Sequence, residues 1–189
     1  MVPALIAGVD EAGRGPLAGP VTAAAVILPP EGAPQGCADS KALSARARIR
    51  LDEAIRATCA WGLGWASARE IDALNIHQAT LLAMRRAVAA LPVRPALLLV
   101  DGLNDPGAGL PARTIVGGDA REAAIAAASI LAKVARDRRM ARLCVRHPGY
   151  GFARHKGYPA PAHLAALAAL GPCVQHRRSF APVAAALAR

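Results

Sequence analysis

Two short apolar runs separated by a glycine-rich turn constrain the fold of this chain more than any other feature. The first run, Ala4 to Asp10, ends in two acidic residues, and the second, Val21 to Leu28, is rich in β-branched residues. Four residues typical of turns lie between them: Gly13, Gly15, Pro16 and Gly19. The pattern predicts a strand, a glycine-rich turn and a second strand.

Strands and helices alternate along the rest of the chain. Ser44 is suited to cap a helix that runs to about residue 60, and Ser67 with Glu70 fits a capping box that opens a helix to about residue 91. A long alanine-rich helix is expected from Asp119 to about Arg146. The other expected elements are strands at Trp61–Ser67, Ala96–Val100 and Arg113–Val116, and a helix at Pro159–Leu170. This order predicts one α/β domain over residues 1–189, with a core to about residue 145 and a basic helical portion over about 146–189.

Positive charge is concentrated at one end of the chain. There are 23 Lys and Arg residues against 13 Asp and Glu residues, which gives a formal net charge of +10. Residues 1–132 hold 12 of each sign, so residues 133–189, with 11 basic residues and Asp137, carry the whole excess. A folded basic face indicates a polyanionic partner, and nucleic acid is the usual one. The alternative is coding bias toward arginine, which does not by itself explain the uneven placement.

Other compositional features exclude several classes of protein. Alanine supplies 47 of the 189 residues, and the roughly 55 bulkier apolar residues suffice for a globular core. No apolar run reaches the roughly 18 residues of a transmembrane helix, and no basic stretch precedes the first apolar run as in a secretory signal. The four cysteines are too far apart for a disulfide framework or a zinc site. We expect a monomeric, cytoplasmic protein without a membrane partner.

Acidic side chains follow two of the predicted strands. Asp10 and Glu11 end the first strand, and Asp101 follows Ala96–Val100, so carboxylates 91 positions apart would meet if these strands are neighbours. Asp119, after two glycines, could approach the same point. Carboxylates held together repel one another unless a cation lies among them, and all-oxygen ligands select Mg²⁺ or Mn²⁺ over Zn²⁺. Taken singly, each acid is also compatible with a solvated turn or cap.

A carboxylate cluster beside a basic face is typical of phosphodiester chemistry. Two metal ions about 4 Å apart can activate a water and stabilise the leaving oxygen of an in-line displacement, with no covalent nucleophile. In the Gly13-Arg14-Gly15 turn the backbone can approach a ligand closely and Arg14 can meet a phosphate, although the same residues can form a simple tight turn. The glycine spacing does not fit a dinucleotide-binding motif.

Longer motifs resemble those of one family, ribonuclease HII. The stretch Gly8 to Val21, with the sequence GVDEAGRGPLAGPV, resembles the N-terminal signature of that family. The resemblance extends over about residues 5–183. Further motifs match in the same order: Asp39-Ser40-Lys41, Val100-Asp101-Gly102, Gly118-Asp119, Ala127–Lys133, Arg136-Asp137, Tyr150-Gly151-Phe152, His155–Tyr158 and His176–Phe180.

This resemblance implies a ribonuclease H-like fold: a mixed five-stranded sheet flanked by helices, with a C-terminal helical extension. It implies an endoribonuclease that cuts RNA in RNA–DNA hybrids and at single ribonucleotides embedded in duplex DNA. A metal-activated water would attack on the 5′ side of the ribonucleotide, leaving 3′-OH and 5′-phosphate ends. By motif, the catalytic and metal-binding carboxylates are Asp10, Glu11, Asp101 and Asp119, with two Mg²⁺ or Mn²⁺ ions when substrate is bound. Asp137 competes for the fourth position, but we expect it to pair with nearby arginines.

The resemblance also implies residues that bind the substrate. The Gly13-Arg14-Gly15 turn resembles the element whose backbone contacts the ribose at the RNA–DNA junction. Tyr158 resembles the aromatic residue that packs on the sugar of the adjacent deoxynucleotide, the alternative being a half-buried core tyrosine. Candidate phosphate contacts are Lys41, Ser44, Lys133, Arg154, His155 and Lys156. The sequence departs from the family pattern at Ala42 and Ala160, where polar side chains are missing. These departures put the strength of substrate binding in question and leave the metal site untouched.

Two other functions are compatible with parts of this pattern. The same carboxylates would serve a general metal-dependent nuclease or phosphatase. A non-catalytic nucleic-acid-binding protein would explain the basic region, but four acids facing nucleic acid without a metal would repel phosphate.

Overall fold

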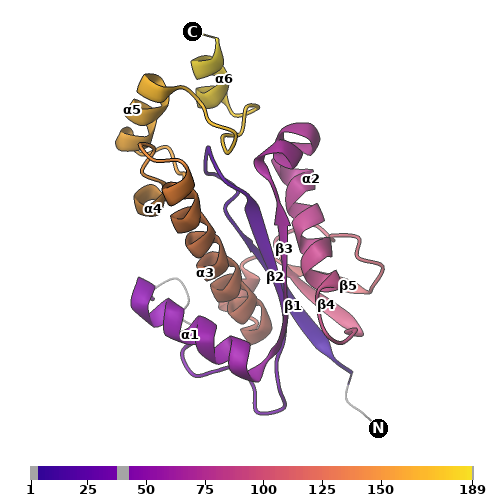
Figure 1. The fold of residues 1–189 in the computed structure, drawn as a ribbon. Helices are drawn as coiled ribbons and strands as arrows, with labels where there is room; N and C mark the ends of the chain where they lie inside the picture. The colour runs from indigo at the N-terminus through magenta and orange to yellow at the C-terminus, as the bar shows by residue number, and fades with distance from the viewer. Residues whose placement is uncertain (1–3, 38–42, 189) are drawn as a thin grey trace.

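A mixed five-stranded sheet forms the centre of the protein, as predicted (Figure 1). The computed structural model describes residues 4–37 and 43–188. The sheet has the order β3-β2-β1-β4-β5, in which β1 pairs antiparallel with β2 and parallel with β4, β2 pairs antiparallel with β3, and β4 pairs parallel with β5. The strands are β1 (Ile6–Ala12), β2 (Val21–Ile27), β3 (Ala60–Ala66), β4 (Leu97–Asp101) and β5 (Ala112–Ile115).

Helices cover both faces of the sheet. Helices α1 (Ala45–Thr58) and α3 (Ala123–Arg146) lie on one face, and α2 (Ala68–Ala89) lies on the other (Figure 1). Both predicted caps are confirmed. The Ser44 hydroxyl accepts a hydrogen bond from the Ala47 amide at 3.2 Å, and Ser67 and Glu70 bond each other's backbone amides. In the described part of the chain, no helix is long and apolar enough to cross a membrane.

Three shorter helices follow α3: α4 (Phe152–His155), α5 (Pro161–Leu170) and α6 (Ala181–Leu187). Only α5 was predicted, because four or seven residues are too few for a helical repeat of apolar positions to be visible. This C-terminal segment lies beside the loop that joins β1 to β2 (Figure 1). The Leu17 amide donates to the Gly157 carbonyl, and the Arg177 amide donates to the Leu17 carbonyl, both at 2.8 Å. The basic third of the chain therefore holds the glycine-rich loop in place.

The prediction that the long helix starts at Asp119 is wrong. Asp119 lies in a separate 3₁₀ helix, η2 (Gly118–Ala120), and α3 begins at Ala123. Gly117 adopts a left-handed conformation with φ 63°, and the amides of Arg121 and Glu122 fold back onto the Gly118 carbonyl. This turn separates Asp119 from α3 and buries its side chain to 8% exposure.

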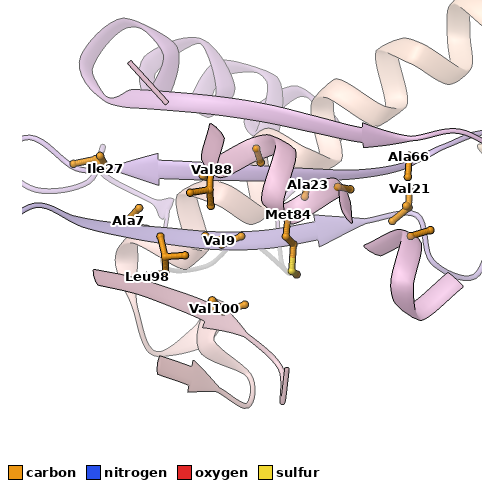
Figure 2. Close-up of a cluster of buried hydrophobic side chains, with 14 of the residues drawn as sticks. Ala7, Val9, Val21, Ala23, Ile27, Ala66, Met84, Val88, Leu98 and Val100 are labelled. Atoms are coloured by element: carbon orange, nitrogen blue, oxygen red, sulfur yellow. The ribbon is translucent and has the colours of Figure 1, made fainter. Parts of the chain in front are cut away.

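Small residues set the distance between the helices and the sheet. Figure 2 shows Val9 and Val100 of neighbouring strands packed with Met84 and Val88 of α2. On β3, side chains at Gly62 and Gly64 would place Cβ atoms 2.2 Å and 2.0 Å from backbone carbonyl oxygens of α2. Glycine at these two strand positions therefore has a packing role, because it lets α2 approach β3 closely.

Candidate active site

Asp10 and Asp101 follow the last paired residues of two neighbouring parallel strands. Val9 of β1 pairs with Val100 of β4, so the next residue in each strand is one of the two aspartates. A side chain at Gly8 would collide with the backbone of α3, and Asp10, two residues further along β1, shares that face. The two strands are thus neighbours, which was the condition for these carboxylates to meet.

Glu11 and Asp119 reach the same end of the sheet from other directions. Glu11 follows Asp10 on the strand, so its side chain leaves the opposite face, where it and Asp101 line a hollow against α2. Glu11 also lines a larger cleft together with Asp119. Asp101 Oδ1 accepts a hydrogen bond from the Gly118 amide at 2.7 Å, which ties β4 to η2. The structure thus brings all four predicted carboxylates to one end of the sheet.

Burial and mutual repulsion shape the charge of these acids. Asp10 is only 5% exposed, and burial, followed by the charges of Glu11 and Asp101, raises its pKa well above the usual value. Hydrogen bonds from Ser129 and from the Glu11 amide oppose that shift. Burial also raises the pKa of Glu11, although Arg14, whose Nη1 lies 3.3 Å from Glu11 Oε1, favours the charged form. The cluster therefore favours any additional positive charge.

The donor set suits a hard divalent cation, but its side chains are bonded elsewhere. Within residues 4–37 and 43–188, no three His, Cys, Asp or Glu side chains converge in an arrangement that could hold a metal ion. Glu11 is turned toward Arg14, and Asp101 is turned toward the Gly118 amide. Each of these contacts is made at one oxygen of a carboxylate that has two, so the contacts do not by themselves prevent either side chain from binding an ion. Carboxylate oxygens are nonetheless the ligands that Mg²⁺ and Mn²⁺ prefer.

The larger cleft has a volume of about 390 Å³ and contains the predicted substrate-binding turn. Gly13, Arg14 and Gly15 line it on one side. Tyr158 lines it too and is 44% exposed, which is inconsistent with a core tyrosine. A Cβ atom at Gly15 would lie 3.6 Å from the Tyr158 ring, so the turn and the ring face each other.

Among the predicted phosphate contacts that the structure describes, one lines this cleft and the others have separate contacts. Lys133 lines it, and its ammonium lies 2.8 Å from Asp137, which therefore pairs with a lysine and not with an arginine as expected. Both ring nitrogens of His155 lie within 3.2 Å of backbone groups, those of Tyr150 and Gly157. Ser44 serves as a helix cap, Arg154 is exposed, Lys156 donates to the Ala153 carbonyl, and Lys41 and Ala42 lie outside the described residues.

Sequence reasoning missed four residues of this region. Arg48, Ser129 and Arg136 line the cleft. Arg177 donates hydrogen bonds to the carbonyls of Gly13 and Arg14, both at 2.6 Å. All four fall within motifs or helices already identified, but an arginine that bonds backbone carbonyls gives no pattern that separates it from a surface arginine.

Comparisons with known proteins agree with this architecture. The family model described as Ribonuclease HII matches residues 7–183. Ribonuclease HII of Chromohalobacter salexigens is 62% identical over 181 residues, which cover 94% of this chain and 90% of that protein. The crystal structure of ribonuclease H2 from Pyrococcus horikoshii matches with a TM-score of 0.83 at 25% identity over 96% of both chains. Bst-RNase HIII in complex with Mn²⁺ matches with a TM-score of 0.77 at 20% identity, over 98% of this chain and 70% of that one. These matches confirm the ribonuclease H-like fold, and the chain belongs to the ribonuclease HII family of hydrolases, which cleave RNA in RNA–DNA hybrids.

Proposed function

We propose that this endoribonuclease also cuts duplex DNA at single embedded ribonucleotides, on the 5′ side of the ribonucleotide, and leaves 3′-OH and 5′-phosphate ends. The observation that carries the proposal is a shared cleft. The Gly13–Gly15 turn and Tyr158 lie close together in its wall, and Glu11 and Asp119 line the same cleft. Recognition of a sugar and cleavage of the adjacent bond can therefore occur in one place.

The turn and the tyrosine suit recognition of one ribose. Gly13 has φ +93° and no side chain, so its backbone can approach a sugar closely. The 2′-OH is both a donor and an acceptor, and it is the local group that distinguishes RNA from DNA. The exposed face of Tyr158 would then pack on the sugar of the next deoxynucleotide and disfavour a second ribose there.

The four carboxylates are proposed to hold the metal. Asp10, Glu11, Asp101 and Asp119 would bind Mg²⁺ or Mn²⁺, two ions with substrate present, and a bound ion would offset the repulsion that raises the pKa of Asp10. When bound, such ions supply the Lewis acidity that activates a water and stabilises the leaving oxygen. The Mn²⁺ complex of Bst-RNase HIII, a relative in fold, supports this choice of ion.

The basic residues around the cleft are proposed to bind the substrate backbone. Phosphates along the duplex would contact Lys133 at the cleft and the exposed Arg154 on α4. We assign the same role to Lys41, Ser44, His155 and Lys156. Because residues 157–177 bond the glycine-rich loop, we also propose that residues 1–189 act as one catalytic domain, with about 146–189 as its substrate-binding portion.

Cleavage of three matched duplexes tests the proposal. One is all DNA, one contains a single ribonucleotide, and one is an RNA–DNA hybrid, each with Mg²⁺ or Mn²⁺. We expect cuts in the second and third only, lost in Asp10→Asn and Asp101→Asn but kept in Asp105→Asn, which changes an exposed aspartate outside the cluster. Cleavage of the all-DNA duplex would favour a general nuclease, and undiminished cleavage by Asp10→Asn would refute the metal assignment.

The role of Tyr158 has a separate readout. Tyr158→Ala should weaken cleavage at a single ribonucleotide more than it weakens overall duplex binding, whereas Tyr158→Phe keeps the ring and should retain most of the cleavage. Equal loss of cleavage and binding in Tyr158→Ala would contradict the role of this ring in recognition.

A further inference from the structure

Two arginines of the basic C-terminal third are inside the protein. Arg136 is 1% exposed and Arg177 is 0% exposed. A fully buried arginine is rare without a paired acid, because removing its charge from water is costly. In the described ranges, however, neither guanidinium forms an ion pair with a carboxylate. Burial, and next the charge of Arg136, lowers the pKa of Arg177 to about 9. The two side chains therefore concentrate uncompensated positive charge in one place.

That place is directly beneath the glycine-rich loop. Arg177 donates to the carbonyls of Gly13, Arg14 and Gly19 at 2.6, 2.6 and 3.0 Å. Arg136 donates from Nε to the Pro20 carbonyl at 3.0 Å and from Nη2 to the Ala18 carbonyl at 3.3 Å. Five carbonyls of one loop thus solvate the two cations, but carbonyl dipoles leave the net charge in place.

One donor of this pair has no acceptor. Arg136 Nη1 is buried, and it makes no hydrogen bond to any residue that the structure describes. The Nε and Nη2 edge of the same guanidinium faces the carbonyls of the loop, so Nη1 is the corner turned away from them. A buried donor without a partner costs folding free energy. A ligand that supplies the missing acceptor would remove this cost.

The position of Arg136 indicates which ligand this is. Its side chain lines the same cleft as Tyr158, and its guanidinium carbon lies 6.0 Å from the Tyr158 ring. A Cβ atom at Gly13 would lie 1.9 Å from Arg136 Nε, so only glycine allows the loop to lie this close to the cation. Two other cations of the cleft, Arg14 and Lys133, already pair with Glu11 and Asp137, while a third, Arg48, forms no ion pair among the described residues and donates to the Leu43 carbonyl. Among these cations of the cleft, Arg136 is the one with a buried donor that has no acceptor in the described residues.

We infer that Arg136 is a phosphate-binding residue, whose Nη1 donates to a phosphodiester of the nucleotide that binds at the Gly13–Gly15 turn and Tyr158. Arg177 is its positioning partner, which fixes the loop and adds charge beneath it. A guanidinium suits this task because it can bond loop carbonyls with one edge and a phosphate oxygen with the remaining corner. The inference rests on the proposed function, since it assigns a substrate contact within the same cleft.

Salt dependence of binding tests this contact. Binding of a labelled duplex with one ribonucleotide would be measured by fluorescence anisotropy at several salt concentrations, in an Asp10→Asn background that keeps the duplex intact. Arg136→Met should bind roughly 10- to 100-fold more weakly, and its slope of log affinity against log salt should be shallower by about 0.9, the share of one phosphate contact. Arg142→Met removes the same charge from the same helix outside this cleft and should change neither quantity. An unchanged affinity and slope in Arg136→Met would overturn the inference.

A second measurement covers the case in which Arg136→Met does not fold. Neutral methylphosphonate linkages are placed one at a time around the ribonucleotide, and binding is compared between the protein with Arg136 and Arg136→Lys. At one linkage the loss should be about tenfold with Arg136 and much smaller with Arg136→Lys, because lysine lacks the Nη1 corner. If the two proteins lost equal binding affinity at every linkage, the inference would be overturned. Cleavage by the unmutated protein is scored separately, so a failed proposed function is distinguishable from a failed phosphate contact.

Discussion

His163 and His176 lie with their Nε2 atoms 3.1 Å apart, and both rings are buried. His163 Nδ1 lies 2.8 Å from the Tyr158 carbonyl oxygen, which can only accept, so Nδ1 carries the hydrogen. In the neutral ring Nε2 of His163 is then an acceptor, and His176 Nε2 donates to it. His176 Nδ1 in turn accepts from the Cys173 amide at 3.0 Å. This histidine relay, from Cys173 through His176 and His163 to the Tyr158 carbonyl, requires both rings to be neutral.

Acid should destabilise the protein through the histidine relay. Burial, followed by the charge of His163, lowers the pKa of His176 to about 4, and burial also lowers the pKa of His163. Because the folded-state values lie below the usual 6.5, the contribution to stability is complete above pH 6.5 and is lost as the pH falls toward 4. For His176 it amounts to about 3 kcal/mol at most. Urea unfolding should give a lower free energy at pH 4.5 than at pH 7.5. His176→Gln removes the titrating ring, so an unchanged pH dependence in that variant would contradict this explanation.

His163 should also act on substrate choice as a positioning residue, because the relay ends on the backbone of Tyr158. His163→Leu removes the donor to the Tyr158 carbonyl, and the loss of one such bond, about 1 kcal/mol, corresponds to a roughly fivefold effect. We expect kcat/KM to fall about fivefold for the duplex with one ribonucleotide and less for a long hybrid. His163→Asn places an amide donor near the position of Nδ1 and should restore part of the ratio. A loss that is equal on both substrates would indicate general destabilisation only.

The sequence was sufficient to predict features that depend on local pattern, whereas the pairing of β1 with β4 was left as a condition. Asp10 and Asp101 each end a run of apolar residues, and parallel neighbours bring such ends together. The caps at Ser44 and Ser67 followed from side-chain chemistry alone. The start of α3 was misplaced because Asp119 fits an N-cap pattern, whereas the left-handed Gly117 closes a separate turn ahead of the helix.

The parts of the site that could not be predicted depend on which arginines are buried in the protein. The charge count treats Arg136, Arg177 and Arg178 alike, yet the first two are buried beneath a loop more than 100 residues away in sequence and the third is exposed. A buried arginine that donates to backbone carbonyls cannot be recognised from the spacing of residues, because every residue type has a backbone carbonyl. Likewise, Asp137 pairs with Lys133 four residues earlier on α3, a helical i,i+4 contact that competes with the expected arginine partners.

Gly13→Ala should damage the site by steric conflict as well as by backbone strain. The new Cβ atom would lie 1.9 Å from Arg136 Nε, and φ +93° is unfavourable for alanine. Gly32 has nearly the same φ, +91°, but a Cβ atom there meets nothing within 4 Å, so Gly32→Ala measures strain alone. We expect Gly32→Ala to cost about 1 kcal/mol with cleavage intact, and Gly13→Ala to cost about 2 kcal/mol more with cleavage reduced at least tenfold. Urea unfolding and single-ribonucleotide cleavage check both, and equal effects of the two substitutions would contradict the close contact with Arg136.

Arg177→Lys should loosen the glycine-rich loop although it conserves charge. The guanidinium of Arg177 bonds three carbonyls that one ammonium cannot reach together, because its donors share a single nitrogen. Loss of two charge-assisted bonds in a buried position corresponds to about 3 kcal/mol of unfolding free energy. Arg178→Lys makes the same change at the next residue, where the side chain is exposed, and should shift stability by less than about 0.5 kcal/mol. Hydrogen exchange of the backbone amides of Gly13, Arg14, Gly15 and residues 17–19 should be faster in Arg177→Lys than in Arg178→Lys. If exchange and melting midpoint were the same in both variants, Arg177 would not be what holds the loop against the cleft.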